Sequence, residues 1–483
     1  MDSTKLDFRS INFGMADATQ EGQEYPQLLT KGYLDPFGLV EYVLNSNVFL
    51  FLGYKGSGKS ALSEHLRLAL SETDKIIDQI SLRNFAYKVF AKITGGKAEP
   101  DATHSLSWSW LLLVEILNNL REDREAVSNR SLDAKKAITL LERSGLLPIS
   151  SISSLVSKSG DVRIKAELFK AFSLEFGFSQ SGANVNMSNV VELLRNLIYS
   201  YTEMRPEIIV FDGLDDILST REVQYEALAS LINVVKDMNL DFKRHSIPIK
   251  IVVLCRTELY ELLPDPNRNK TLQDNSFSMM WYREGVNSQK DCDLVQIANK
   301  RTQLVFPSVS QMFPTFFQRE FNGKEIEEAL LDNTRHIPRD FLQLMRYIQK
   351  QCRGEKVTER EIKQGINAYS TDYFVHEIED ELTGYISNSD IKLTLGLLSS
   401  VRKPEFSLSD IRLIVDSSPE YQGLDIYKVF RILYNCSAIG QLYKDPDNPQ
   451  ITKVRFKYRS RNSNFSISDR IILHRGLRKA LLD

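Results

Sequence analysis

The glycine-rich stretch from Gly53 to Ser60 constrains the fold more than any other part of the sequence. It reads Gly-Tyr-Lys-Gly-Ser-Gly-Lys-Ser and fits the Walker A pattern G-x-x-x-x-G-K-[ST] at every fixed position. An apolar run, Val48 to Leu52, precedes it, and a helical stripe that includes Leu62 and Leu66 follows it. Strand, loop and helix in this order are the context that the pattern requires. We therefore predict an α/β fold with a parallel sheet, in which the loop binds phosphate.

The residue types of this loop suit ATP with magnesium. Glycines let the backbone wrap around an anion without Cβ clashes, and the N–H groups of the loop point at phosphate oxygens. We expect Lys59 to contact the β- and γ-phosphates and the Ser60 hydroxyl to ligate Mg²⁺. A glycine-rich turn that fits by chance is the alternative, and the flanking strand and helix argue against it. The residues predicted to hold the nucleotide here are Gly53, Lys55, Gly56, Ser57, Gly58, Lys59, Ser60 and Ala61.

An acidic signature follows a second apolar run, Ile208 to Phe211. Asp212 ends this predicted strand, at the position where a carboxylate holds Mg²⁺ through its water shell. Asp215 and Asp216 come next, and one of them could orient or deprotonate the water that attacks the γ-phosphate. An aspartate pair on a turn can also simply cap the next helix. We assign the catalytic role to Asp215 and the cap to Asp216, and we keep both as catalytic candidates.

Two arginines are candidates for contacting the γ-phosphate. The apolar strand predicted from Ile247 to Cys255 is followed by Arg256, a catalytic candidate that would sense the loss of this phosphate. Arg339 follows Pro338 at the start of a predicted helix, from which it could fold over the nucleotide. The alternatives are a surface arginine after a strand for Arg256 and a surface salt bridge for Arg339.

The chain of 483 residues is long enough for about three domains. We expect an N-terminal strap over residues 1–45 and a P-loop ATPase core over 46–310. A large insertion at about 82–188 interrupts this core. A helical lid over 311–388 and a winged-helix domain over 389–483 follow it.

Several segments of the first two thirds carry local predictions. The serine-rich run 149–160 is predicted to be a loop, and residues 162–178 a hairpin or irregular strands. Residues 264–290 are predicted to be loop with weak elements. Trp108 and Trp110 are expected to pack in the core.

Two aromatic residues of the strap have two interpretations each. A segment just upstream of a phosphate loop often crosses the base pocket. Tyr33 or Phe37 could therefore stack on an adenine, and packing at the edge of the sheet is the alternative.

The C-terminal region predicts three helices, over 391–400, 406–415 and 425–434, and then a hairpin. This is the order of elements in a winged helix. Alternation along the second hairpin strand places a row of basic residues on one face, namely Lys453, Arg455, Lys457 and Arg459. This basic row could bind DNA phosphates, form a solvated strand edge, or pair with acidic residues of the neighbouring domain.

Composition narrows the class of protein. The formal net charge of −2 gives no general attraction to nucleic acid or membranes, so any basic surface must be local. No apolar run approaches the roughly 20 residues of a membrane-spanning helix, and the first residues lack a signal-peptide pattern. The four cysteines are far apart and show no C-x-x-C spacing. We therefore expect a cytoplasmic protein with reduced cysteines and no membrane partner.

Four motifs occur in an order that resembles STAND-type P-loop ATPases, a group related to the initiator-type AAA+ proteins. They are Gly53 to Ser60, Asp212 to Asp216, the strand ending in Cys255-Arg256, and His336-Ile-Pro-Arg339. Cys255 and His336 depart from this pattern, which usually has a small hydroxyl residue and a glycine there. The opening Asn12-Phe-Gly14 and the ending His474-Arg-Gly-Leu-Arg478 are similar to an uncharacterised bacterial family of P-loop ATPases with a C-terminal winged helix.

The resemblance implies a slow ATPase that acts as a nucleotide-dependent switch. ATP and Mg²⁺ would bind between core and lid, and Pro338 would pack on the nucleotide. The output would be assembly into a homo-oligomer or control of a separate effector protein, as in bacterial anti-phage defence. An ATP-gated DNA-binding protein of the initiator type is the alternative. A small-molecule kinase is a third class, for which the sequence shows no acceptor motif.

Overall fold

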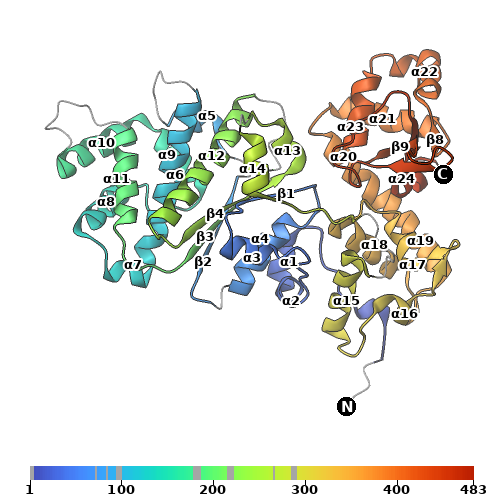
Figure 1. The fold of residues 1–483 in the computed structure, drawn as a ribbon, viewed down its shortest axis with the longest axis horizontal. Coiled ribbons are helices and arrows are strands. Elements are labelled where there is room, and N and C mark those ends of the chain that lie inside the picture. Colours follow the sequence, from blue (N-terminus) through green and yellow to red (C-terminus); the bar gives the residue numbers. More distant parts are fainter. Residues whose placement is uncertain are drawn as a thin grey trace.

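The computed structural model describes residues 5–482 except for short internal segments. These are 71–72, 83–84, 94–99, 178–186, 215–221, 265–266 and 284–290. The helical insertion lies on the left of Figure 1, the central sheet in the middle, and the lid and C-terminal region on the right. The catalytic candidates Asp215 and Asp216 lie outside the described residues.

Five parallel strands form the central sheet, in the order β2-β3-β4-β1-β5. They are β1 (Leu50–Gly53), β2 (Ile76–Ser81), β3 (Glu207–Asp212), β4 (Ile249–Arg256) and β5 (Ser276–Ser278). The predicted α/β fold with a parallel sheet is confirmed. Strand β5 lies in the segment 264–290, for which the sequence predicts mainly loop. Because all strands run the same way, their C-terminal ends meet at one edge of the sheet.

Side chains of the inner strands alternate between two helical layers. Ile208 and Val210 of β3 pack in the cluster of the first layer, and Ile209 packs in that of the second. The first layer contains α3 (Leu39–Asn45) and α4 (Lys59–Leu70), and the second contains α6 (Pro100–Glu122) and α12 (Glu222–Arg244). Two short helices follow β4, namely α13 (Thr257–Leu262) and α14 (Arg268–Asp274).

The N-terminal strap connects the lid to the core. Its elements are η1 (Phe8–Ser10), α1 (Ala18–Glu24) and α2 (Pro26–Thr30). Phe8 packs edge-on against Phe317, with ring centroids 5.1 Å apart, while α1 and α2 pack on α4. A buried ion pair of 2.7 Å between Glu21 and Arg301 fixes the strap to α15 (Asp293–Val305). The strap therefore contacts both the core and the lid.

The described part of the insertion is helical. Its helices besides α6 are α5 (Tyr87–Phe90), α7 (Arg124–Ser128), α8 (Leu132–Arg143), α9 (Ile152–Gly160), α10 (Val162–Phe176) and α11 (Met187–Tyr199). The prediction of a loop is wrong for 152–160, and the prediction of strands is wrong for 162–176, because both segments are helices. Asp161 caps α10 by accepting two N–H groups of its first turn, and Leu168 and Phe172, four residues apart, are buried on one face.

Trp108 and Trp110 lie in the core, as predicted. Both indoles are almost fully buried. Trp108 Nε1 donates to the carbonyl of Ala227 (2.7 Å), and Trp110 Nε1 donates to the hydroxyl of Ser159 (2.9 Å). Their polar groups are therefore satisfied within the protein.

The lid packs in one hydrophobic cluster with the C-terminal region. Leu294 and Ala298 of α15 belong to this cluster together with Phe341. The expected core boundary at residue 310 falls after α15, and we propose that the lid begins near residue 292. After α15 the lid contains α16 (Met312–Phe316), β6 (Glu320–Phe321), β7 (Lys324–Glu325), α17 (Ile326–Leu331), α18 (Pro338–Gln351), α19 (Glu359–Tyr369), η5 (Ser370–Phe374) and α20 (Val375–Leu382).

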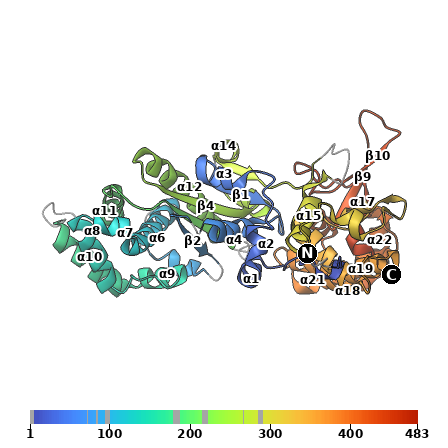
Figure 2. The same ribbon diagram turned by 90° about the horizontal axis from the view of Figure 1, so that it is seen from below.

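The C-terminal region contains helices and an antiparallel sheet with the order β10-β9-β11-β8. Three helices come before a hairpin, in the predicted order, and Figure 2 shows this hairpin projecting from the region. The elements are α21 (Asn388–Ser400), β8 (Glu405–Phe406), α22 (Leu408–Ser417), η6 (Pro419–Tyr421), α23 (Ile426–Asn435), β9 (Ile439–Lys444), β10 (Thr452–Arg455), β11 (Arg470–Leu473) and α24 (Arg475–Leu481).

Replacing Asp123 tests how the insertion is anchored to the sheet. Asp123 is fully buried, and its carboxylate accepts the backbone N–H (3.0 Å) and the Nε–H (2.9 Å) of Arg205, just before β3. Asp123→Ala removes this acceptor, so we expect the free energy of unfolding to fall by on the order of 2 kcal/mol and scanning calorimetry to record a lower melting midpoint. Asp133→Ala is the control, because Asp133 is exposed and lies 3.8 Å from Lys136. Equal effects of the two substitutions would contradict the anchoring role.

Candidate functional site

The loop between β1 and α4 forms a tight turn that requires glycine. Gly56 and Gly58 have φ angles of +82° and +97°, a region that L side chains rarely adopt. Lys59, the first residue of α4, is buried. Its Nζ donates to the carbonyls of Gly53 (3.0 Å) and Tyr54 (3.2 Å). The lysine ammonium is therefore held inside the turn.

Further groups of the loop fit an anionic ligand. The Ser57 hydroxyl is buried and has no hydrogen-bond partner among the described residues. The Trp281 indole donates to the Ser57 carbonyl (2.8 Å), which fixes this part of the loop. Ser60 and Ala61, in the first turn of α4, line the adjoining cavity. A helix N-terminus, a buried lysine and a buried hydroxyl form a donor set that suits phosphate.

The ends of β3 and β4 bring two predicted residues to the same edge of the sheet. Asp212 is aligned with Ser81 of β2, and its carboxylate accepts the N–H of Gly213 (2.7 Å). Arg256 is aligned with Gly53, the first residue of the loop motif. Because β4 lies between β1 and β3, Arg256 is placed between the loop and Asp212.

Glu258 in α13 is a candidate that sequence reasoning missed. Burial raises its pKa to about 7, against the opposing charges of Arg256 and Lys59. Its Oε2 is buried without a hydrogen-bond partner among the described residues. A carboxyl group that titrates near neutrality therefore lies in the electrostatic range of the loop lysine. The only sequence signal is its place two residues after Arg256, which ends β4.

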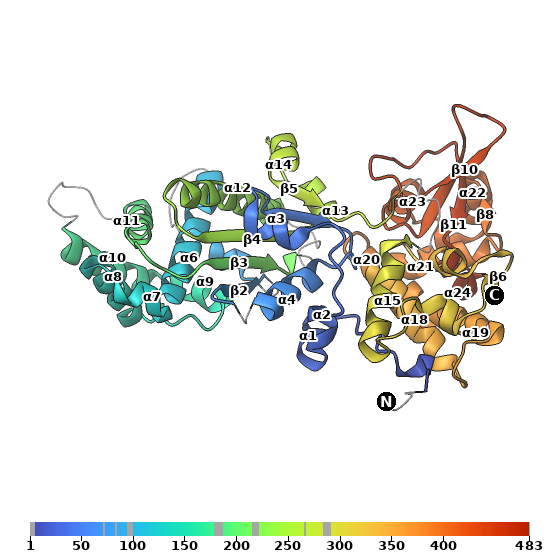
Figure 3. The same ribbon diagram turned by 60° about the horizontal axis from the view of Figure 1, so that its bottom comes forward.

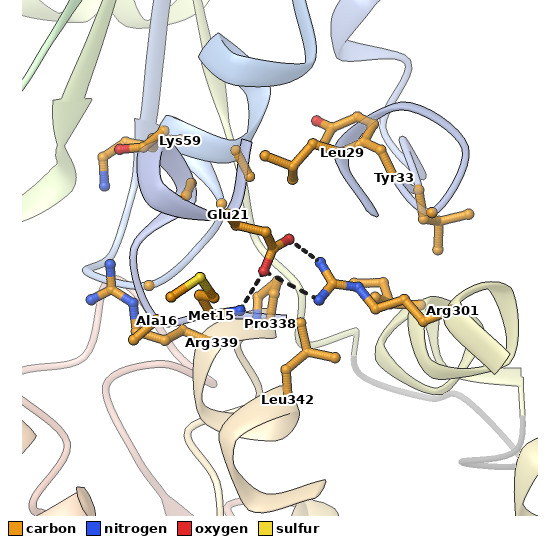
Figure 4. A pocket seen from close by; sticks show the side chains of 18 of the residues that line it. Met15, Ala16, Glu21, Leu29, Tyr33, Lys59, Arg301, Pro338, Arg339 and Leu342 are labelled. Atoms are coloured by element: carbon orange, nitrogen blue, oxygen red, sulfur yellow. Dashed lines mark hydrogen bonds and ion pairs between the residues drawn. The ribbon is translucent and has the colours of Figure 1, made fainter. Parts of the chain in front are cut away.

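A cavity of about 110 Å³ opens beside the loop, and Figure 4 shows the side chains around it. Lys59 lines it from the core, and Pro338 and Arg339 line it from the lid. The ion pair of Glu21 and Arg301 lies at its wall. Small-molecule pockets usually measure roughly 300–1,000 Å³. The cavity is therefore smaller than a typical small-molecule pocket.

The two aromatic residues of the strap differ in their surroundings. Tyr33 lines the cavity and stacks on His65 of α4, with ring centroids 4.1 Å apart. Phe37 packs against Phe277 of β5 and against Trp281. Packing at the sheet edge is therefore the correct interpretation for Phe37, and His65 already covers one face of Tyr33.

The lid contacts the loop through Glu377 of α20. Its Oε1 lies 2.8 Å from Nζ of Lys55 and 3.3 Å from Nη1 of Arg339. The backbone N–H of Arg339 donates to the carbonyl of Gly56 (3.3 Å). Burial alone would raise the pKa of Glu377, but Lys55, Arg335 and Arg339 together lower it to about 2. We call the contact of Glu377 with Lys55 and Arg339 the Glu377 bridge. It places a carboxylate against two cations that the sequence assigns to phosphate.

His336 occupies the position of the usual glycine and adopts a backbone that favours glycine, with φ of +51°. Its ring is stacked with Tyr458 of the C-terminal region, 5.5 Å between centroids, and lies edge-on to Tyr282. Burial and then the charge of Arg459 lower the pKa of His336 to about 3, whereas Asp332 acts in the opposite direction. A neutral imidazole therefore lies between the lid and the C-terminal region.

The predicted basic row is not one strand face. Strand β10 ends at Arg455, and Lys457 and Arg459 lie in the following turn. Lys457 is largely buried and donates to the carbonyl of Ser463 (3.0 Å). The prediction of an alternating row from 453 to 459 is wrong, because the strand is too short to carry it.

Three cations of this row pair with aspartates. The pairs are Lys453–Asp445 at 2.7 Å, Arg455–Asp469 at 3.1 Å and Arg459–Asp332 at 3.7 Å. Asp332 belongs to the lid and also pairs with Arg475 (3.0 Å). The structure thus supports the alternative in which the row pairs with acidic residues, one of them in the neighbouring domain, and does not favour a DNA-binding face.

The described residues contain no cluster of three or more His, Cys, Asp and Glu side chains placed to hold a metal ion. The cysteines Cys255, Cys292, Cys352 and Cys436 are free thiols. Among the same described residues, no helix combines the length and the apolar character needed to cross a membrane.

One family model matches part of the chain. Residues 292–376 match the FunZ-associated C-terminal helical domain. The match begins at the N-cap of α15 and ends in α20, which agrees with a lid that starts near residue 292. No curated protein sequence matches the chain.

Three solved structures are similar to the chain at low identity. The Orc1 protein of Aeropyrum pernix, solved in complex with DNA, is 12% identical with a TM-score of 0.37, covering 95% of this chain and 94% of that chain. The Walker-type ATPase PABY2304 of Pyrococcus abyssi is 15% identical with a TM-score of 0.36, covering 87% and 91%. Cdc6p of Pyrobaculum aerophilum is 9% identical with a TM-score of 0.33, covering 94% and 97%.

Replacing His336 tests the buried imidazole. An unfolded histidine takes up a proton below about pH 6.5, whereas folded His336 stays neutral down to about pH 3. The contribution of His336 to the free energy of unfolding is therefore complete above pH 6.5. It falls by at most about 1.4 kcal/mol per pH unit as the pH drops toward 3. We expect His336→Asn, which tolerates a positive φ, to reduce the fall of the melting midpoint between neutral pH and pH 5.

The matched control is His376→Asn, because His376 is exposed on α20. It should keep the wild-type dependence of the melting midpoint on pH. An unchanged pH dependence in His336→Asn would contradict the assignment of a neutral buried ring.

Proposed function

We propose that the protein binds ATP with magnesium at the loop between β1 and α4 and hydrolyses it slowly. The observation that carries this proposal is the buried Lys59 ammonium inside a glycine turn, beside the buried hydroxyl of Ser57. Lys59 and Ser60 would hold the β- and γ-phosphates and the metal, and Asp212 would hold the metal through water. Arg256 would contact the γ-phosphate from the sheet.

The attacking water requires a carboxylate near the end of β3 or β4. Asp215 is our proposed water-positioning residue, with Asp216 as the helix cap. Glu258 is a second candidate, because its pKa of about 7 suits a general base at neutral pH.

The Glu377 bridge makes the lid the moving part of the proposed switch. Lys55 and Arg339 are neutralised by a lid carboxylate, and the cavity beside them is smaller than a typical small-molecule pocket. Binding of ATP would exchange this carboxylate for phosphate oxygens and release α20 from the loop. The lid would then respond to the nucleotide because its two positions differ in their contacts with Lys55 and Arg339.

Movement of the lid would reach the C-terminal region. Asp332 of the lid pairs with Arg459 and Arg475 of that region. Arg461 in turn contacts the core, through Ser278 (2.6 Å) and Glu261 (3.7 Å). The proposed output is a new position of this winged-helix-like region. It would control assembly of the chain or a separate effector, and anti-phage defence is the setting that the sequence resemblance suggests.

Replacements in the loop and at the end of β3 separate binding from hydrolysis. We expect Lys59→Ala to weaken ATP binding at least about tenfold, because it removes the charge inside the turn. Asp212→Asn should retain most of the binding and lose ATP turnover, because it weakens a metal ligand. Calorimetry and phosphate release measure the two effects. Normal turnover in either variant would overturn the assignment.

Replacing Glu377 tests the switch. Glu377→Gln preserves the shape of the side chain and removes the charge that neutralises Lys55 and Arg339. We expect ATP to bind about five- to tenfold more tightly, because it no longer competes with a carboxylate. Glu379→Gln, two residues further along the same helix and more exposed, should bind ATP like the wild type. Weaker or unchanged binding in Glu377→Gln would refute the competition.

A further inference from the structure

A second cavity lies at the opposite end of the central sheet from the glycine loop. It measures about 570 Å³ and is bounded by the first residues of β3 and β4 and by the C-terminal ends of α3 and α12. The strands run from this end toward the lid (Figure 3), so the length of the sheet separates the two cavities. Its volume is within the roughly 300–1,000 Å³ typical of small-molecule sites.

Lysines from separate parts of the chain line this second cavity, which we call the lysine cavity. They are Lys75, Lys236, Lys243, Lys250 and Lys270. None of them makes an ion pair with another described residue. Their hydrogen bonds among the described residues go to neutral groups, namely the Thr271 hydroxyl, the Asn47 amide oxygen and the carbonyls of Tyr42 and Ser46.

Carboxyl groups do not balance these lysines. The carboxyl-bearing residues of the lining are Glu207 and Asp274. Glu207 is buried, and this burial raises its pKa to about 8, so it is mostly neutral at neutral pH. Asp274 is then the one lining residue that can offset the lysine charge, and the lining keeps a clear excess of positive charge.

Helix ends explain part of this arrangement. Lys250 donates to the carbonyls of Tyr42 (2.9 Å) and Ser46 (2.8 Å), at the C-terminus of α3, and Lys243 lies in the last turn of α12. Cations are favourable at both places. Burial and the charge of Lys243 nevertheless lower the pKa of Lys250 to about 8. The repulsion between these lysines is relieved when an anion binds between them.

The floor of the lysine cavity is apolar. Val43, Phe49, Ile247 and Ile249 line it and are buried. Leu240, which also lines the cavity, is exposed at its rim. A hollow with an apolar floor and cations around it fits a compact ligand with a nonpolar body and charged groups. A nucleic-acid duplex would need cations spread along an open face.

We propose that the lysine cavity binds a small molecule that carries two or more phosphate groups, at a site separate from the glycine loop. Lysines from the residue before β2, from α12, from β4 and from α14 would surround one polyanion. The proposal does not depend on ATP binding at the loop, so it is tested in a chain whose loop is disabled.

The test uses the full chain with Lys59→Ala and titrates it with inorganic tripolyphosphate, and separately with ATP, in a calorimeter at low and at moderate salt. We expect one site per chain, with weaker binding at higher salt. Adding the substitutions Lys75→Ala, Lys236→Ala and Lys270→Ala should weaken binding at least about tenfold. These three lysines are chosen because they do not lie at the C-terminal ends of α3 and α12, where a cation is favourable without any ligand.

The matched control removes the same charge elsewhere. Lys92→Ala, Lys135→Ala and Lys170→Ala change exposed lysines of the insertion and should leave binding within about twofold of the parent. Equal losses in the two triple variants, or no binding of either ligand to the parent chain, would overturn the proposal. So would binding of a short DNA duplex, but not of tripolyphosphate, that depends on the cavity lysines, because the surface would then be a nucleic-acid contact.

A labelling experiment on the parent chain avoids any effect of substitutions on folding. Lys250, with its lowered pKa, should react early with an amine-acetylating reagent at about pH 8. Tripolyphosphate should slow acetylation of the cavity lysines several-fold in peptide mass spectrometry, and should leave Lys92 and Lys135 unchanged. Equal protection of all lysines, or protection of none, would contradict a site in the cavity.

Discussion

The contact between the lid and the phosphate loop depends on one carboxylate, that of Glu377. Its pKa of about 2 keeps it ionised at physiological pH, and its partners Lys55 and Arg339 come from the two sides of the interface. Charges on partly buried side chains are screened less by salt and water than charges on an open surface, so Glu377 attracts Lys55 and Arg339 strongly. Removing Glu377 would take the nearest carboxylate from both cations and leave Lys55 with Asp380 at 3.8 Å. The position of α20 therefore depends on what occupies the loop.

The regions beyond this contact are arranged to move together. The lid and the C-terminal region share a continuous hydrophobic cluster, and Asp332 and the buried His336 tie the two across their boundary. The C-terminal region contacts the core through Arg461 and through Tyr458, whose ring lies edge-on to that of Tyr282. Packed interiors resist deformation more than a few polar contacts do. We therefore expect a displacement of α20 to shift the lid and the C-terminal region together and to disturb the contacts of Arg461 with the core.

The sequence predicted the sheet well, because each inner strand is a short apolar run that ends in a residue with a distinct chemistry. It missed α10, since Val162, Ile164 and Phe169 suggest strands when the cap at Asp161 is overlooked. It missed the three-residue strand β5, which is too short to show a period. The loop side of the site follows from its motif. Glu377 carries no motif, because tertiary packing alone brings it to the loop, and Glu258 is marked only by its place two residues after Arg256.

Amide hydrogen exchange of the full chain, with and without ATP and magnesium, tests most directly whether phosphate and Glu377 compete for the same cations. We predict that ATP speeds exchange in α20 and around Arg461, while exchange in α6 stays unchanged, because release of the Glu377 bridge removes the contact of α20 with the loop. Slower or unchanged exchange in α20, at an ATP concentration where calorimetry records binding, would contradict the competition on which the proposed switch rests.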